Sequence, residues 1–267
     1  MLFVDAQNMR CLGFRLAAAR LDRYFQAIMS TIASQLQQVH ARIDAACASA
    51  HRPASAVTLL CVSKTHPAQA VRDAFAAGER SFGENYVQEG VDKIATLADL
   101  RSQITWHLIG PLQSNKTRVV AEHFDWVHSV GRLKIAQRLS EQRPANLPPL
   151  QICLQVNISG EESKSGLMPS ELAEVAMAVS QLPRLQLRGL MSIPEPADTE
   201  AAQRAPHVAL RVLFNAVNQI GLKMDTLSMG MTADMDAAIL EGATVVRVGT
   251  AIFGARAAVT SSNNLTT

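Results

Sequence analysis

Long apolar runs, paired cysteines and a large charge of one sign are all missing from this 267-residue sequence. No run of about 18 uninterrupted apolar residues occurs, so no transmembrane helix is expected. The 25 basic and 23 acidic residues leave a net charge of only +2, which gives no general attraction to nucleic acid. The four cysteines are scattered and form no C-x-x-C pair, which argues against a disulfide framework or a cysteine metal site. The composition, 48% hydrophobic and 18% charged, therefore predicts a globular protein of the reducing cytoplasm.

The first 28 residues differ in composition from the rest. They hold four arginines against two aspartates, whereas the remaining chain is neutral. The segment lacks the continuous apolar core and the cleavage site of a signal peptide, which leaves a transit peptide or a surface helix as alternatives. We interpret residues 1–28 as a dispensable extension, followed by one domain over 29–260 and a polar tail over 261–267.

From residue 30 onward, short apolar segments alternate with segments of helical periodicity. Residues 30–50 predict an additional N-terminal helix. Strands are expected over 57–62, 80–82, 105–109, 126–130, 150–156, 187–193, 226–228 and 245–248. Helices are expected to begin near residues 67 and 87 and to cover 115–123, 133–142, 171–181, 207–220, 235–240 and the turn 249–253.

Eight strands that alternate with helices imply parallel pairing and right-handed crossovers. A (β/α)₈ TIM barrel takes roughly 250 residues, so one barrel nearly fills the chain. The competing fold is an open doubly wound sheet, but its G-x-G-x-x-G fingerprint is absent after the first strand. The sequence therefore predicts an α/β protein with a single (β/α)₈ barrel, whose additional N-terminal helix covers the bottom or the side.

Lys64 is the middle residue of the SKT turn that follows the first predicted strand, at the end of the barrel where binding sites lie. Partial desolvation there would lower the pKa of the lysine amine and make it a nucleophile for carbonyl groups. The alternative is a lysine whose amine simply reaches solvent.

Glycines and hydroxyls follow the last two predicted strands, where barrel proteins commonly bind phosphate. Gly230 and Gly249 would let backbone N–H groups approach an anion, and Ser228 and Thr250 add hydroxyl donors. Ordinary turn chemistry is the alternative. Together with Lys64, this phosphate cup predicts either a phosphorylated aldehyde cofactor or the substrate of a Schiff-base aldolase.

Two histidines, His107 and His128, fall at predicted strand ends and raise the question of a metal site. No third ligand of matching character is evident, so we interpret both as pocket or core residues and predict no metal. The other histidines, His66 among them, fall on predicted helices or loops and are expected at the surface.

Seven motifs lie in order along the chain: SKT at 63–65, GENYVQE at 83–89, WHLIGPLQSNK at 106–116, NISGEESKSG at 157–166, GLMSIP at 189–194, LSMGMTAD at 227–234 and VRVGTAIFGAR at 246–256. Together they closely resemble the pyridoxal phosphate homeostasis protein family. The resemblance runs from about residue 29 to residue 256, which is nearly the whole predicted barrel.

This resemblance implies a fold-type III barrel like the cofactor domain of bacterial alanine racemase. Family members hold pyridoxal 5′-phosphate (PLP) as a Schiff base but lack an established enzymatic reaction. They are implicated in buffering free PLP and delivering it to other proteins. For this chain the resemblance implies PLP as the cofactor, a cytoplasmic monomer, apo-PLP enzymes as partners, and neither nucleic acid nor membrane as a partner.

Carried onto this sequence, the resemblance makes Lys64 the Schiff-base lysine and places Arg247 at the pyridine nitrogen. The other implied site residues are a ring pocket of Asn85, His107 and Ser192, and a phosphate cup of Ser228, Gly230, Gly249 and Thr250 shaped by Met229 and Met231. The roles of the loop 161–164 and of residues 1–28 stay open.

Two alternatives remain: a catalytically active PLP enzyme, such as an amino-acid racemase, and a cofactor-free Schiff-base aldolase. Arg247 can only donate hydrogen bonds, so it would leave the pyridine nitrogen unprotonated and weaken PLP as an electron sink. The only tyrosines are Tyr24 in the extension and Tyr86 after the second strand, and 19 residues after Val248 are too few for a second domain. A second acid–base group is not evident, which favours a carrier over an enzyme.

Overall fold

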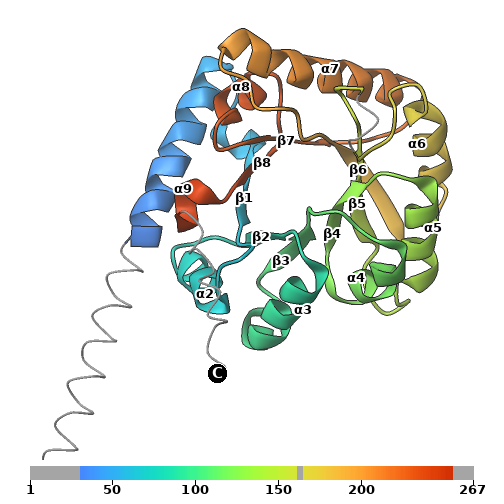
Figure 1. Cartoon of the computed structure of the whole chain (residues 1–267), viewed down its shortest axis with the longest axis horizontal. Coiled ribbons are helices and arrows are strands. Elements are labelled where there is room, and N and C mark those ends of the chain that lie inside the picture. Colours follow the sequence, from blue (N-terminus) through green and yellow to red (C-terminus); the bar gives the residue numbers. More distant parts are fainter. Residues whose placement is uncertain (1–30, 161–164, 255–267) are drawn as a thin grey trace, which may run out of the picture.

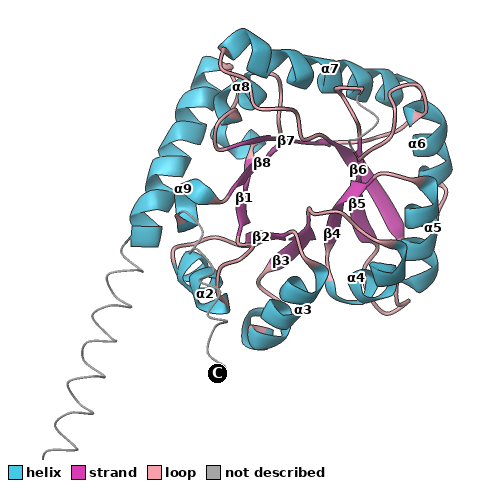
Figure 2. Ribbon diagram, viewed as in Figure 1, coloured by secondary structure: helices cyan, strands magenta, loops and turns pink. Residues whose placement is uncertain are grey.

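The chain folds into a closed barrel of eight parallel strands in sequential order, ringed by helices (Figures 1 and 2). This computed structural model describes residues 31–160 and 165–254. The expectations for residues 1–28, 161–164 and 261–267 lie outside the described residues. The predicted single (β/α)₈ barrel is confirmed, and the open sheet is excluded because Thr58 of the first strand pairs with Val245 of the last.

The strands are mostly buried on both faces, as parallel strands covered by helices are. They are β1 (Thr58–Val62), β2 (Ser81–Glu84), β3 (Thr105–Leu108), β4 (Trp126–Val130), β5 (Leu150–Gln155), β6 (Leu185–Met191), β7 (Thr226–Met231) and β8 (Val245–Val248). Their continuous apolar sequences explain why most of them were predictable within one or two residues.

The helices connect the strands and cover the outside of the barrel. They are α2 (Ala68–Ala76), α3 (Val87–Thr96), α4 (Thr117–His123), α5 (Leu133–Gln142), α6 (Leu172–Ser180), α7 (Glu200–Gln219), α8 (Met235–Leu240) and α9 (Thr250–Phe253), with short 3₁₀ turns η1 (Ala54–Ala56), η2 (Ala98–Leu100) and η3 (Ser114–Lys116). None of the helices in the described residues is both long and apolar enough to span a membrane.

A helix over residues 31–49 precedes the barrel and packs along its side, next to α8 and α9 (Figure 1). Its apolar face buries Ile32, Leu36, Val39 and Ile43 in the main core. Arg42 fastens it to the barrel, because its guanidinium donates to the carbonyl of Thr232 at 2.7 Å. Of the two predicted positions, the structure therefore selects the side of the barrel.

Side chains that alternate along the strands divide into two cores. Leu59 and Cys61 of β1 face outward and join the large core between the barrel and the helices. The side chains between and after them face the lumen, where a much smaller apolar cluster consists of Leu60, Val62, Ile109 and Val245. Apolar side chains therefore fill only part of the lumen.

Strand β7 differs most from the prediction, which ended it at residue 228. It continues through Met231, so Met229 and Gly230 lie within the strand rather than after it. Its register with β8 shifts between Ser228 and Met231, and Gly230 has φ +90°. Ser, Met and Gly lack the β-branched signal of a strand, so pairing with β8 decides this segment.

Helix α7 begins at Glu200 rather than at residue 207. Thr199 caps it, because its hydroxyl accepts from the N–H of Ala202 at 3.3 Å. The helix contains Pro206, a residue that in sequence is typical of a helix start. Strand β6 is likewise displaced, to Leu185–Met191.

Candidate functional site

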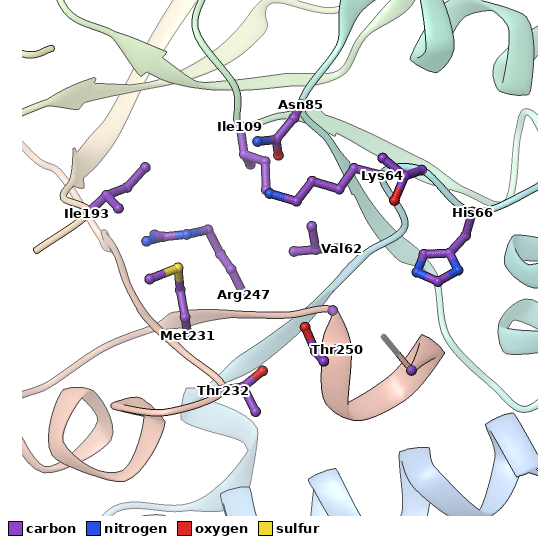
Figure 3. A pocket seen from close by; sticks show the side chains of 13 residues that line it. Val62, Lys64, His66, Asn85, Ile109, Ile193, Met231, Thr232, Arg247 and Thr250 are labelled. Carbon is purple, nitrogen blue, oxygen red and sulfur yellow. The ribbon is translucent and has the colours of Figure 1, made fainter. Parts of the chain in front are cut away.

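A cavity lies at the carboxyl end of the barrel, where sites of this fold are found (Figure 3). Its walls are formed by Val62, Lys64, Thr65, His66, Asn85, Ile109, Ile193, Met231, Thr232, Arg247, Gly249, Thr250 and Gly254. The structure thus brings together six of the predicted site residues: Lys64, Asn85, Met231, Arg247, Gly249 and Thr250.

Lys64 enters the cavity from the turn after β1. Its neighbour Ser63 is fully buried, and Thr65 has φ +64°, a left-handed conformation that a β-branched residue seldom adopts. Figure 3 shows the Lys64 side chain extended, with its amine near Ile109. The turn therefore aims a lysine amine along a partly apolar wall.

A buried ion cluster holds this turn in place. The Lys93 ammonium donates to the carbonyl of Ser63 at 2.6 Å and to carboxylate oxygens of Glu84 and Glu89, each at 2.7 Å. Glu89 also accepts from the N–H of Thr65 at 2.5 Å, and Glu84 accepts from the hydroxyl of Ser63 at 2.6 Å. The backbone on both sides of Lys64 is therefore tied to charged groups.

Sequence reasoning missed this cluster. Both glutamates belong to the GENYVQE motif, and Lys93 follows Glu89 at the i,i+4 spacing of a helical ion pair. What only the fold shows is that Lys93 also reaches back to Ser63, thirty residues earlier. Burial raises the pKa of Glu84, and the charge of Lys93 opposes that rise.

Arg247 projects from β8 into the lumen and lines the cavity. Its guanidinium donates to the carbonyls of Ser228 at 2.6 Å and Ser192 at 2.8 Å, and to the hydroxyl of Ser228 at 2.9 Å. Among the described residues, no carboxylate forms an ion pair with it. Burial lowers the pKa of Arg247 to about 10, which leaves it charged at neutral pH. A buried cation held by neutral groups favours an electron-rich ligand atom beside it.

The part of the cavity wall away from Lys64 presents small residues and hydroxyls (Figure 3). A Cβ atom at Gly249 would lie 2.9 Å from the carbonyl oxygen of Val62, so only glycine allows this close approach. Thr232 and Thr250 both line the cavity here, and Figure 3 shows their hydroxyls on the same side of it. Thr232 was not predicted as a site residue, although it belongs to the LSMGMTAD motif at 227–234.

Asn85 is held by a tight contact between two loops. A Cβ atom at Gly110 would lie 2.1 Å from the carbonyl oxygen of Asn85, so the two backbones touch. The side-chain oxygen of Asn85 is buried and has no hydrogen-bond partner among the described residues. Buried acceptors are rarely left unsatisfied, which indicates that this oxygen faces a ligand or an ordered water.

The structure does not bring the other predicted residues to the cavity wall. Met229 packs outward in the main core, so its position does not support a role in shaping the cup. Ser228 is fully buried in the lumen, and Ser192 contributes its carbonyl to Arg247. Gly230 shapes β7, since a Cβ there would lie 2.5 Å from that of Ala238. Met229 and Ser228 point to opposite faces of β7 because side chains alternate along a strand.

His128 is a buried core residue as predicted, whereas His107 and His66 lie elsewhere than predicted. His107 lies deep in the lumen, where its Nδ1 is 2.9 Å from Nε2 of His128. The described residues contain no group of three side chains able to hold a metal ion. His66, expected at the surface, instead lines the cavity and packs against Phe253 with ring centroids 5.2 Å apart. It directly follows the SKT motif, which could have indicated this position.

Comparison with known proteins places this chain among its relatives. Residues 34–257 match the family model of the alanine racemase N-terminal domain. The pyridoxal phosphate homeostasis protein of Pseudomonas aeruginosa is 63% identical over 228 residues, which cover 85% of this chain and 97% of that protein. The protein of the same name from Escherichia coli K12 is 54% identical over 229 residues, covering 85% of this chain and 98% of its own length.

A solved structure extends the likeness to three dimensions. PipY of Synechococcus elongatus, solved with PLP bound, is 41% identical with a TM-score of 0.73, and the match covers 84% of this chain and 100% of PipY. The resemblance seen in the seven sequence motifs is thereby confirmed. This chain belongs to the pyridoxal phosphate homeostasis protein family, which shares the fold of the alanine racemase N-terminal domain.

Proposed function

We propose that this protein binds PLP in the cavity at the carboxyl end of the barrel and holds it on Lys64. In this proposal it buffers or delivers PLP in the cytoplasm, as a monomer whose recipients are PLP enzymes in their apo form. One observation carries the proposal: Lys64 and the buried Arg247 line the same cavity as a glycine backbone and two threonine hydroxyls.

The residues fit the chemistry of PLP, which combines a phosphate, a pyridine ring and an aldehyde. When bound, PLP supplies an aldehyde carbon that forms a carbon–nitrogen double bond with a lysine amine and releases one water molecule. The amine of Lys64 is the only lysine amine on the cavity wall among the described residues. Asn85 offers a buried oxygen without a partner, as expected for a group that faces a ligand.

Two further groups would hold the ends of the molecule. The hydroxyls of Thr232 and Thr250 and the backbone at Gly249 suit a phosphate, with Met231 beside them. The Arg247 guanidinium would donate to the pyridine nitrogen, since Ser228 and Ser192 already orient it. Because the hydroxyl of Ser228 is engaged by Arg247, Thr232 is the better placed phosphate ligand of the two.

The same arginine supports a carrier rather than an enzyme. A guanidinium only donates hydrogen bonds, so Arg247 leaves the pyridine nitrogen without a proton and weakens the electron sink that racemases and transaminases need. Tyr86 is 58% exposed and does not line the cavity. His66 is the one imidazole on the cavity wall among the described residues, and the enzyme alternative would depend on it.

The covalent role of Lys64 is tested by replacing it. Lys64→Ala should abolish the visible absorbance of PLP-loaded protein, because no amine then faces the aldehyde, while far-UV circular dichroism stays unchanged. Lys134→Ala, on the exposed surface of α5, serves as the control and should keep the absorbance. Borohydride reduction followed by peptide mass spectrometry should find the pyridoxyl group on Lys64. A pyridoxyl group mainly on another lysine would contradict the proposal, and a wild-type protein that takes up no PLP would favour the aldolase alternative.

A further inference from the structure

A chain of buried polar side chains runs from Arg247 down the lumen of the barrel. The Arg247 guanidinium donates to the hydroxyl of Ser228 at 2.9 Å, and this hydroxyl lies 2.8 Å from Nδ1 of His128. Nε2 of His128 in turn lies 2.9 Å from Nδ1 of His107. The four side chains come from β8, β7, β4 and β3, and all are at most 5% exposed. Neither histidine lines the cavity, so neither has a role in the binding scheme above.

The donors and acceptors of this chain follow from Arg247. A guanidinium has no acceptor, so the Ser228 oxygen accepts from it and its single O–H is left to donate. A buried hydroxyl seldom leaves its proton unpaired, so this O–H donates to Nδ1 of His128, which lies 2.8 Å away. His128 then carries its proton on Nε2 and donates to Nδ1 of His107, which in turn carries its proton on Nε2.

Both rings are held in place and uncharged. Burial lowers the pKa of His107 to about 3, and burial together with His107 and Arg247 lowers the pKa of His128 well below its ordinary value. His107 stacks on Trp126 at 5.4 Å between centroids and meets His128 edge-on at 5.1 Å. Two neutral imidazoles therefore stand in a fixed geometry beneath a permanent cation.

This hydrogen-bonded chain of side chains ends at His107, toward the amino end of the barrel. Nε2 of His107 is buried and has no partner among the described residues. His107 lines a polar hollow at the amino end of the strands, together with Thr58, Trp126 and Arg188. Its N–H can therefore be satisfied by a water molecule in that hollow without any effect on the direction of the other bonds.

We propose that His128, supported by His107, is a positioning residue for Arg247: through the Ser228 hydroxyl it fixes the guanidinium that faces the ligand. Two of the three bonds to this guanidinium go to backbone carbonyls, which no substitution removes. The third depends on the Ser228 hydroxyl, and that hydroxyl has one orientation only while His128 accepts its proton. The expected effect on PLP binding rests on the proposed function, whereas the hydrogen-bonded chain of side chains does not.

The chain is tested first in ligand-free protein. Long-range ¹H–¹⁵N spectra of ¹⁵N-histidine-labelled protein, assigned with His107→Gln and His128→Asn, should show both rings neutral with the proton on Nε2. This state should persist from about pH 8 to about pH 5, where an ordinary histidine becomes charged. A proton on Nδ1 of His128, or an imidazolium at either ring near pH 6, would overturn the proposal whether or not PLP binds.

The positioning role is tested with graded variants. His128→Ala and Ser228→Ala should each weaken PLP binding roughly tenfold and shift the visible absorbance maximum, because the bond lost belongs to a charged group. His128→Asn places an amide oxygen where Nδ1 was, so it should restore much of the affinity and the original absorbance maximum. Ser140→Ala removes a buried hydroxyl that donates to the carbonyl of Pro183, far from the cavity, and is the matched control.

The outcomes separate the two proposals. Failure of the wild-type protein to bind PLP refutes the proposed function. The NMR spectra then still test the hydrogen-bonded chain, because they report the protonation of His107 and His128 without PLP. Unchanged affinity and absorbance in both His128→Ala and Ser228→Ala would overturn the positioning role. If His128→Ala does not fold, Ser228→Ala and His128→Asn still give the answer, since both keep most of the buried volume.

Discussion

At the scale of single residues, the site depends on groups that do not touch the cavity. Lys64 is aimed by a turn in which Thr65 adopts φ +64°, and the carboxylate of Glu89 holds that turn through the Thr65 N–H. Lys93 connects this carboxylate to Glu84 and to the carbonyl of Ser63. Lys64, the proposed PLP-binding lysine, lines the cavity, whereas Lys93, which holds its turn, is only 5% exposed.

Lys93→Met should therefore destabilise the protein strongly. The methionine fills a similar volume but leaves the fully buried Glu84 without a cation, and breaking a buried ion pair in this way costs about 3–5 kcal/mol. Chemical denaturation followed by circular dichroism measures the change in the free energy of unfolding. Borohydride trapping of PLP at Lys64 should slow as well, since the turn loses its tether.

A second variant separates charge from packing. Lys93→Met combined with Glu84→Gln removes both buried charges and should recover part of the lost stability. If Lys93→Met alone unfolds at the same denaturant concentration as the wild-type protein, the cluster does not stabilise this turn.

At the scale of elements, the helix over residues 31–49 is part of the barrel rather than an appendage. It covers the outside of the barrel beside α8 and α9 (Figure 1), where the short α9 leaves the wall uncovered. Its four large apolar side chains, Ile32, Leu36, Val39 and Ile43, are each at most 5% exposed. Arg52, just beyond it, donates to the carbonyls of Ile239 and Ala243, both at 2.8 Å.

This placement sharpens the prediction about residues 1–28. A chain that begins at residue 29 keeps the whole helix, so it should melt within a few degrees of the full chain and bind PLP equally. A chain that begins at residue 51 loses four buried side chains worth about 1.5–3 kcal/mol each, which is comparable to the entire stability of a domain. It should not fold. Loss of PLP binding on removal of residues 1–28 alone would show that our domain boundary is wrong.

At the scale of the whole molecule, polar side chains gather at the carboxyl end of the barrel and deeper in its lumen. Its carboxyl end brings the Lys64 amine, the Arg247 guanidinium and two threonines to one cavity. Its lumen is occupied by neutral histidines and hydroxyls, and its core lies mainly between strands and helices. In the proposed function, this cavity holds the aldehyde of PLP without offering the proton donor at the pyridine nitrogen that drives amino-acid chemistry.

We therefore expect no sustained racemisation or transamination. PLP-loaded protein incubated with L-alanine in deuterium oxide should exchange the α-proton no faster than free PLP, as followed by proton NMR. His66→Ala is the matched variant, because His66 is the imidazole on the cavity wall. Turnover well above free PLP that disappears in His66→Ala would establish the enzyme alternative and contradict the carrier.

The sequence alone determined the alternation of eight strands with helices, the ends of most strands, and the placement of Lys64 at the mouth of the barrel. These features depend on local signals: continuous apolar strands, helical periodicity and collinear motifs. The motifs also identified the family, and the structural comparison agrees.

Only the tertiary structure decided which polar residues converge. Met229 and Ser228 are neighbours in one motif, yet β7 turns one into the outer core and the other into the lumen. Successive side chains along a strand point to opposite faces of the sheet. An error in predicting the end of β7 therefore changes which side chains are expected at the cavity. Thr232 and His66 line the cavity although they were not predicted there, and His107 lies in the lumen although it was. Barrel closure decides this, because it sets the distances between strands that are far apart in the sequence.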